Sequence, residues 1–377
     1  MAVAVTPVRT PAALAAFAGF SARAYGGDPD FVAPIRSIRA LRLWSAGALR
    51  PGGRLTLLEA RRGTQRVGTI AVCRDVAHDR HRPEDRVAFF GSFELMDDPE
   101  VADALLEAAE GTARGWGAGT LRGPRGLTRI DERGALVEGR GLPPFLAGYQ
   151  PPWIAQFLEA RGYEKHHDAL AYDVDLDDER GQQKPLPERL ARRAAAVSIP
   201  GLEVRSARVG NLRADLDLAY QVFVDGFRDV PDNTPMSKRQ FVSIGAAYLA
   251  VADPRMLQLA AVDGRPAGFA LCFPELNEGL AAAHGRLFPG GWLRLARALR
   301  GVRTASFKLL GLLPEHRGSG LHALLIRQTI TGIRAAGYRR LECSLIDERN
   351  GAMRHIVEEA GCAVYRRYRV YERTLDA

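Results

Sequence analysis

Apolar residues in the second half of this chain change their spacing several times, and each change marks a predicted element. Leu216, Tyr220 and Phe223 recur at the three- and four-residue spacing of one helix face, which predicts an amphipathic helix over residues 212–229. A short run just before it, residues 202–207, has the length and bounding glycine of a strand.

Further apolar runs extend this order along the chain. Two runs around the dipeptide Asp263-Gly264 predict a hairpin. The full predicted order is strand, helix, hairpin, strand, glycine turn, helix, strand, helix and a strand pair. The expected bounds after the first helix are 255–273 for the hairpin, 304–313 for the strand, 322–337 for the helix and 339–346 for the next strand. Part of this order recurs earlier, as a hairpin at 54–73, a strand at 86–95 and a helix at 99–117.

The two halves of the chain also end alike. Residues 157–176 (FLEARGYEKHHDALAYDVDL) align without gaps with residues 356–375 (IVEEAGCAVYRRYRVYERTL). The identical pairs are Glu159 and Glu358, Gly162 and Gly361, Tyr172 and Tyr371, and Leu176 and Leu375. Both segments predict a helix end, a glycine stop and a strand pair. We therefore expect a duplicated domain, at residues 1–178 and 201–377, with a linker at 179–200 that has room for a short helix.

A glycine turn, RGSGLH at residues 317–322, joins the predicted strand at 304–313 to the following helix. The turn and the element order resemble the GNAT superfamily of acyl-CoA-dependent acyltransferases, whose signature there is Q/R-x-x-G-x-G/A. This resemblance implies an α/β (mixed α+β) fold of two tandem GNAT-like domains, each a mixed, mostly antiparallel sheet flanked by helices. His322 departs from the signature, because a small residue normally occupies its place.

The resemblance implies acyl-CoA as the donor substrate and no metal. CoA carries a pyrophosphate, and a helix N-terminus offers it unpaired N–H groups and a positive dipole end. Glycines let the backbone approach the phosphate oxygens without an intervening Cβ. The implied donor-binding residues are Leu312, Arg317, Gly318, Ser319, Gly320, Leu321, His322 and Asn350. Two alternatives stay open, since the turn can simply join two elements and Asn350 can cap the next helix.

The first half lacks this turn. Asp97, Asp98 and Glu100 stand where the glycines would be, and carboxylates there would repel a pyrophosphate. We expect these acidic residues to cap a helix, and the first domain not to bind CoA.

Across most of its length the chain resembles a narrower bacterial group of tandem GNAT-like proteins that includes bacterial ceramide synthases. The segments that carry this resemblance are HDRHRPEDRVAFFGSFELMDD, LRGPRG and GLPPFLAGYQPPW in the first half, and FPELNEGL, LPEHRGSG and DERNGAM in the second.

Acyl transfer to an amine requires a base for the amine proton, donors for the thioester oxyanion and an acid for the leaving thiolate. By resemblance, backbone N–H groups of residues 309–314 (LLGLLP) lie near the thioester carbonyl. Glu342 is the first candidate base and Asp347 the second, while Glu315 is a weaker third. Tyr365 is the candidate acid, by resemblance. Each has an ordinary alternative, as a solvated strand carboxylate or a packed tyrosine.

Two arginine-rich segments bear on the acceptor. GGWLRLARALRGVR (residues 290–303) and IRSIRALRLW (residues 35–44) are basic, amphipathic and contain Trp, a combination that suits an anionic membrane surface. Helices packed on their own core are the alternative. The net charge of +8 favours an anionic partner, but the arginines form no single stripe with stacking aromatics, so nucleic acid is not expected.

The sequence therefore predicts a cytoplasmic N-acyltransferase, peripheral on the inner membrane face, that acylates the amine of a long-chain sphingoid base. The alternatives are an N-acetyltransferase for a small soluble amine or amino acid, and a non-catalytic acyl-CoA-binding module. Other chemistries have weaker support. His78 and His81 lack a third ligand for a metal, and the run His166-His167-Asp168 is expected to be polar surface at the start of a strand.

Overall fold

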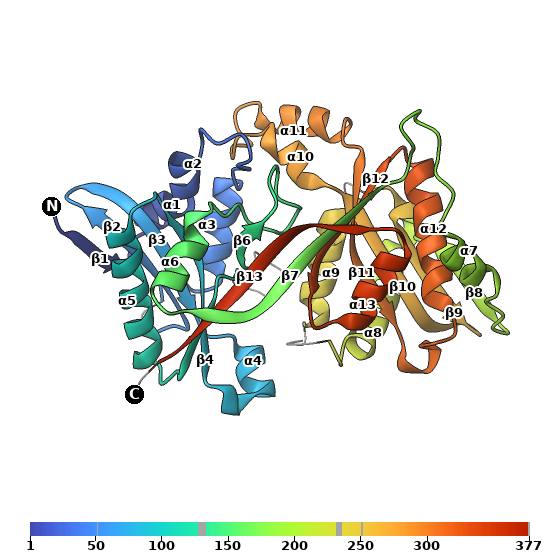
Figure 1. Ribbon diagram of the computed structural model, residues 1–377, viewed down its shortest axis with the longest axis horizontal. Helices are drawn as coiled ribbons and strands as arrows, with labels where there is room; N and C mark the ends of the chain where they lie inside the picture. The colour runs from blue at the N-terminus through green and yellow to red at the C-terminus, as the bar shows by residue number, and fades with distance from the viewer. Residues whose placement is uncertain (51, 127–132, 231–235, 250–251, 376–377) are drawn as a thin grey trace. The chain divides into compact units, whose positions relative to one another are not determined.

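The structure, a computed structural model, describes residues 1–50, 52–126, 133–230, 236–249 and 252–375 (Figure 1). The chain forms two compact units. The first consists of Met1–Ala169, Asn277–Gly301 and Arg366–Ala377, and the second of Leu170–Leu276 and Val302–Tyr365. The units group segments by packing rather than by sequence order, so the predicted boundaries at residues 178 and 201 stay a prediction.

The second unit is built on a mixed sheet. Its strands, in spatial order, are β8 (Leu202–Ser206), β9 (Leu257–Val262), β10 (Arg265–Pro274), β11 (Thr304–Leu312), β12 (Arg340–Asp347) and the part of β7 (Glu164–Asp175) that begins at Leu170. The pair β11–β12 is parallel, and the three pairs from β8 to β11 are antiparallel. The predicted hairpin turns at Asp263-Gly264, where both residues have positive φ.

Helices cover both faces of this sheet. They are α7 (Glu188–Ala195), α8 (Leu212–Gly226), α9 (Lys238–Leu249), α12 (Leu321–Ala335) and α13 (Gly351–Glu359). On one face, α12 buries its apolar side chains against Phe307 and Leu341 of the central parallel pair. On the other, Phe227, directly after α8, and Phe241 of α9 pack on Phe269 of β10.

The first unit repeats this strand order. Its strands, in spatial order, are β1 (Val3–Pro7), β2 (Leu55–Arg62), β3 (Gln65–Cys73), β4 (Val87–Leu95), β5 (Thr120–Gly123) and the part of β13 (Ala363–Thr374) that begins at Arg366, with β6 (Ala135–Glu138) paired to β13. Here too a central pair, β4–β5, is parallel. The repeated order, within mostly antiparallel sheets flanked by helices, confirms the predicted fold class.

The remaining helices belong mainly to the first unit. They are α1 (Pro11–Ala18), α2 (Phe20–Ala24), α3 (Arg36–Ser45), α4 (Val76–His81), α5 (Pro99–Gly115), α6 (Trp153–Ala160), α10 (Leu276–Ala281) and α11 (Gly291–Leu299). Short 3₁₀ helices occur at Pro83–Asp85, Val209–Asn211, Pro254–Met256 and Pro314–His316. The helix expected within residues 179–200 is α7, which buries Leu190 and Ala194 in the core of the second unit.

One expectation is wrong. Each half was predicted to close with a pair of strands, but β7 and β13 are single strands of 12 residues each. The physical reason is that neither segment contains a glycine, a proline or a turn dipeptide where a hairpin would have to reverse.

Candidate functional site

The glycine turn before α12 requires its glycines. Gly318 and Gly320 have φ of +79° and +82°, in the left-handed region that residues with a Cβ rarely adopt. A Cβ at Gly320 would also lie 3.2 Å from Cγ2 of Val197 and 3.4 Å from the carbonyl oxygen of Arg193, at the end of α7. Conformation and packing therefore both select glycine at this helix start.

This turn presents free backbone donors. Within the described chain, the N–H groups of Gly318, Ser319, Gly320 and His322 donate no hydrogen bond. Ser319 Oγ donates to His316 O at 2.7 Å and accepts from Leu321 N at 3.3 Å, which holds the loop in shape. Unpaired N–H groups at the start of a 15-residue helix are donors of the kind that can bind an anion such as a pyrophosphate.

Arg317 is fixed beside these donors. Its Nη1 lies 2.7 Å from Oδ2 of Asp229, and its Nη2 donates to Gly226 O at 3.2 Å, at the end of α8. Gly226 has no room for a side chain, because a Cβ would lie 2.7 Å from Leu312 O on β11. The end of α8 therefore packs directly on the strand that leads into the turn, and Arg317 ties the two together.

His322 lies in the first turn of α12 and is half-buried. Burial lowers its pKa, and the positive charge of Arg193 on α7 lowers it further. The imidazole is therefore neutral near pH 7, and it adds no positive charge for the phosphate.

The parallel strands β11 and β12 separate next to this turn. Their pairing ends at Phe307 and Cys343, although β11 continues to Leu312 and β12 to Asp347. A bulge in β11 lies at the point of separation. Phe307 and Leu309 pair with consecutive residues of β10, so Lys308 between them has no partner in the register. Beyond the bulge, the edge of β11 that faced β12 is not paired to it.

A buried polar cluster lies where the strands separate. It consists of Ser306, Lys308, Glu342 and Ser344, and we call it the Glu342 cluster. Oε2 of Glu342 accepts from Ser306 Oγ at 2.5 Å and from Lys308 Nζ at 3.2 Å. Lys308 Nζ also donates to Ser344 Oγ at 2.7 Å. Oε1 of Glu342 is buried and has no hydrogen-bond partner within the described chain.

The register of the two strands explains the Glu342 cluster. Ser306 and Glu342 are paired directly across the parallel ladder, and Glu342 and Ser344 lie on one face because strand residues alternate. A buried carboxylate needs a counter-ion, and Lys308 supplies it. Glu342 was predicted from the sequence, but Ser306 and Lys308 were not. Their signal was two polar residues, two positions apart, within a mostly apolar strand.

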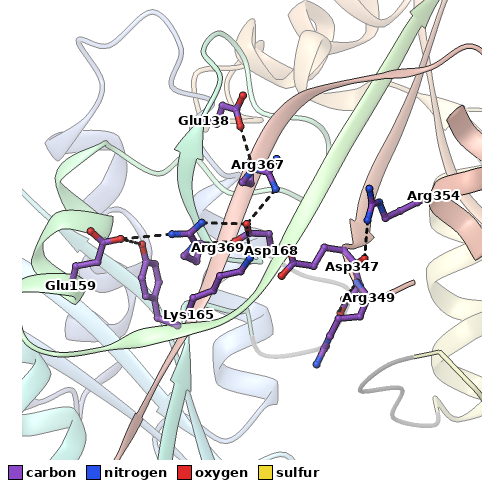
Figure 2. Close-up of polar contacts among 11 residues, drawn as sticks. Glu138, Glu159, Lys165, Asp168, Asp347, Arg349, Arg354, Arg367 and Arg369 are labelled. Carbon is purple, nitrogen blue, oxygen red and sulfur yellow. Dashed lines mark hydrogen bonds and ion pairs between the residues drawn. The ribbon is translucent and has the colours of Figure 1, made fainter. Parts of the chain in front are cut away.

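Asp347 has a different environment. Its Oδ1 accepts from the backbone N and Nε of Arg349, both at 2.9 Å, and its Oδ2 accepts from Arg349 Nη2 at 2.7 Å (Figure 2). Both oxygens are therefore occupied, which makes Asp347 less suited than Glu342 to accept a proton.

Two further predicted residues lie on nearby elements of the second unit. Asn350 caps α13, with its Oδ1 accepting from Met353 N at 3.1 Å, which is the structural use that the sequence left open. Tyr365 on β13 is half-buried, and the guanidinium of Arg340 lies 5.8 Å from its ring centre. Their roles toward a donor stay predictions.

The corresponding junction of the first unit, between β4 and α5, is acidic and has no glycine turn. Asp98 caps α5 by accepting from Val101 N at 3.3 Å, and it pairs with Arg62 at 3.0 Å. Its carboxylate thus takes the place that an anion would need, as expected from the sequence.

The end of β4 is also covered by side chains of its own unit. Tyr25 Oη donates to Leu95 O at 3.0 Å and accepts from Leu95 N at 2.8 Å. Trp153 Nε1 donates to the same carbonyl at 3.1 Å. In the second unit, the corresponding strand edge is the one left unpaired beyond the bulge of β11.

The run at 166–168 is not polar surface, which corrects the expectation. His167 and Asp168 are buried. The carboxylate of Asp168 can be buried because three cationic side chains of the first unit pair with it (Figure 2). Its carboxylate accepts from Arg369 Nε at 2.9 Å and from Arg367 Nη1 at 3.3 Å, and it lies 3.0 Å from Lys165 Nζ. Burial opposes ionisation, but hydrogen bonds from Arg369 and Lys165 outweigh it and lower the pKa of Asp168.

The described residues contain no group of three or more His, Cys, Asp or Glu side chains placed to hold a metal ion. His78 is buried and lies 3.3 Å from Asp85, through Nε2 and Oδ2. Within the described residues, none of the helices combines the length and the apolar character that crossing a bilayer requires.

Comparison with known proteins identifies relatives over nearly the whole chain. No family model matches it. The chain is 30% identical over 379 residues to a protein of Caulobacter vibrioides named bacterial ceramide synthase, covering 98% of this chain and 97% of that protein. It is 29% identical over 374 residues to Protein YghO of Escherichia coli, with coverages of 96% and 93%.

Two solved structures share the fold. A GCN5-related N-acetyltransferase from Sphaerobacter thermophilus matches with a TM-score of 0.56 at 16% identity, covering 100% of this chain and 96% of its own. A tandem GNAT protein from the clavulanic acid biosynthesis pathway matches with a TM-score of 0.56 at 15% identity, with coverages of 100% and 99%. At such identities the likeness establishes a tandem GNAT fold.

Proposed function

Because this chain belongs to the family of GNAT-type acyltransferases that includes the bacterial ceramide synthase, we propose that it transfers an acyl group from acyl-CoA to the amine of a long-chain, sphingoid-type base. N-acyl transfer from a CoA thioester follows from membership of the family. The lipid acceptor is the proposal, and it is supported by the name of a relative that aligns with nearly the whole chain.

The donor is proposed to bind in the second unit alone. The free N–H groups of Gly318, Ser319, Gly320 and His322 would hold the pyrophosphate. The pantetheine arm would follow the unpaired edge of β11 toward the bulge, with Leu312 lining its path and Asn350 as a further hydrogen-bonding partner. The side chain of Leu321 is buried in the core of the second unit, so this residue would support the turn by packing. The thioester would then reach the place where β11 and β12 separate.

The chemistry is carried by one observation, the unpartnered Oε1 of Glu342. The amine nitrogen forms a bond to the thioester carbon, and the carbon–sulfur bond breaks. One amine proton passes to Oε1 of Glu342, directly or through water, and Tyr365 returns a proton to the departing thiolate. Backbone N–H groups of β11 beyond Lys308 stabilise the oxyanion.

Lys308 and Ser306 are proposed to position Glu342. Both donate to Oε2, which fixes the rotamer of the carboxylate while Oε1 stays available. They are positioning residues, because neither needs to touch the substrate. Asp347 is the alternative base, although Arg349 occupies both of its oxygens.

A lipid acceptor implies that the enzyme works at a membrane, and we propose a peripheral location on the cytoplasmic face. A long-chain base resides in the bilayer, so a purely aqueous enzyme would rarely meet it. The second candidate is an N-acetyltransferase for a soluble amine, which is favoured by the names of the solved structures that share the fold.

The test supplies purified protein with long-chain acyl-CoA and either a long-chain base in detergent micelles or a panel of soluble amines and amino acids. We expect release of the CoA thiol, and an amide product detected by mass spectrometry, in the mixture that contains the long-chain base and not in the mixtures with soluble amines. Thiol release with the soluble panel and none with the base would refute the lipid assignment and leave the acyltransferase activity intact. Acyl-CoA binding without release in any mixture would favour the non-catalytic binding module.

A further inference from the structure

Two segments of the first unit expose large apolar side chains beside arginines. Residues 35–50, which include α3, expose Ile38, Leu41 and Trp44, and Trp44 is 60% exposed. Residues 284–301, which include α11, expose Phe288, Trp292 and Leu293, and Phe288 is 78% exposed. We call these two segments together the basic-aromatic surface.

The basic-aromatic surface accounts for the net charge of the protein. Its two segments contain eight arginines and no aspartate or glutamate. The rest of the chain then has 44 basic and 44 acidic residues and is neutral. Within the described chain, Arg286, Arg294 and Arg297 are exposed and have no carboxylate in ion-pair range.

The two segments are in contact. Arg36 N, at the start of α3, donates to Gly285 O at 3.2 Å. A Cβ at Gly285 would lie 3.0 Å from both Ala33 Cβ and Pro34 O. The exposed residues of α3 and those around α11 therefore belong to neighbouring parts of one unit.

Each helix is fixed to the unit by its other face. Arg39 pairs with Glu94 of β4 at 2.7 Å, and Leu43 is buried. On α11, Leu295 and Leu299 pack so closely on Gly279 of α10 that a Cβ there would lie 2.6 Å from Leu299 Cδ2. The exposed apolar residues are therefore not needed to attach these helices.

From these observations we infer that the basic-aromatic surface docks on an anionic lipid bilayer. Arginines without carboxylate partners match anionic headgroups, and Trp, Phe and Leu side chains insert at the boundary of headgroups and acyl chains. Nucleic acid would use the arginines but not Ile38, Leu41, Phe288 and Leu293. This inference rests on the proposed lipid acceptor and names the surface through which the enzyme would reach it.

The test is co-sedimentation with vesicles. The protein should bind vesicles of phosphatidylglycerol and phosphatidylcholine, and bind those of phosphatidylcholine alone at least about tenfold more weakly. The double variants Arg294→Glu/Arg297→Glu and Phe288→Ser/Trp292→Ser should each lower the affinity about tenfold or more. Arg80→Glu and Met96→Ser, which change exposed residues of the same unit outside this surface, are the matched controls.

Three results would overturn the inference. They are equal binding to neutral and anionic vesicles, unchanged binding of both double variants, and binding of duplex DNA or an acidic carrier protein without binding of vesicles. Circular dichroism of every variant separates unfolding from lost docking. Wild-type acylation of the base in detergent micelles tests the proposed function separately, since micelles need no anionic bilayer.

Discussion

Tyr371 on β13 donates a hydrogen bond of 2.7 Å to Oε1 of Glu159 on α6, within the first unit. Tyr172 on β7 makes the equivalent bond to Oε1 of Glu358 at 3.0 Å, within the second. These are the residues that the sequence repeat places at matching positions. Tyr371, from the second half of the sequence, thus belongs to the first unit, and Tyr172, from the first half, belongs to the second. The closing strands β7 and β13 are therefore exchanged between the repeats.

Substitution at Gly320 should abolish donor binding. An aspartate there would force a side chain into the left-handed region and place a negative charge among the N–H donors that are proposed to hold the pyrophosphate. Titration calorimetry with acyl-CoA should give one site per chain in the wild type and no binding in Gly320→Asp. Gly337→Asp is the matched control, because Gly337 has φ of +90° at the other end of α12.

The first unit should contribute nothing to donor affinity. Asp97→Ala, at the acidic start of α5, should leave both the dissociation constant and the stoichiometry unchanged. Two equivalent sites per chain would contradict the assignment of donor binding to the second unit.

Removing Lys308 should destabilise the protein strongly. The side chains of Lys308 and Glu342 are 7% and 4% exposed, so Lys308→Met would leave a buried carboxylate without its counter-ion. We expect a loss of about 3 kcal/mol in the free energy of unfolding, measured by urea denaturation. Lys238→Met, which breaks the exposed pair with Asp217, should cost at most about 1 kcal/mol.

The double variant separates charge from packing. Glu342→Gln in the Lys308→Met background should recover most of the lost stability, because the buried charge is then absent. If the double variant instead loses as much unfolding free energy as the two single variants together, the ion pair is not what stabilises the Glu342 cluster.

His322 should make stability depend on pH. Its pKa in the folded state is lowered by burial and by Arg193, while an unfolded histidine titrates near the ordinary value of 6.5. Between these values the unfolded chain binds more protons, so the free energy of unfolding falls as the pH drops below about 6.5. His322→Asn should flatten this fall between pH 7 and 5, and His81→Asn, which changes an exposed histidine of the first unit, should not. If the free energy of unfolding depends on pH in the same way in the wild type and both variants, His322 is not the group responsible.

The sequence predicted the elements whose conformation depends on residues that are neighbours in the chain. Gly318 and Gly320 indicate their turn because only glycine adopts its backbone freely, and Asp263-Gly264 indicates its hairpin for the same reason. The buried state of Asp168 was missed because its partners Arg367 and Arg369 lie about 200 residues away.

The Glu342 cluster shows the same limit. Glu342 was found by resemblance, but its pairing with Ser306 and Lys308 depends on the parallel register of β11 and β12 and on a bulge. Neither has a local sequence signal. The exchange of β7 and β13 was likewise invisible, since the repeat alignment shows which residues correspond and not which unit each strand joins.

The most direct test of the account measures amide formation by the Glu342→Gln variant. Long-chain acyl-CoA and a long-chain base are supplied at saturation, the amide is quantified by mass spectrometry, and acyl-CoA affinity is measured in parallel. Gln keeps the size of Glu342 but cannot take the amine proton. We predict unchanged donor affinity and turnover lower by about 10²-fold, the usual contribution of a general base. Turnover equal to that of the wild type would contradict the assignment of Glu342 as the base.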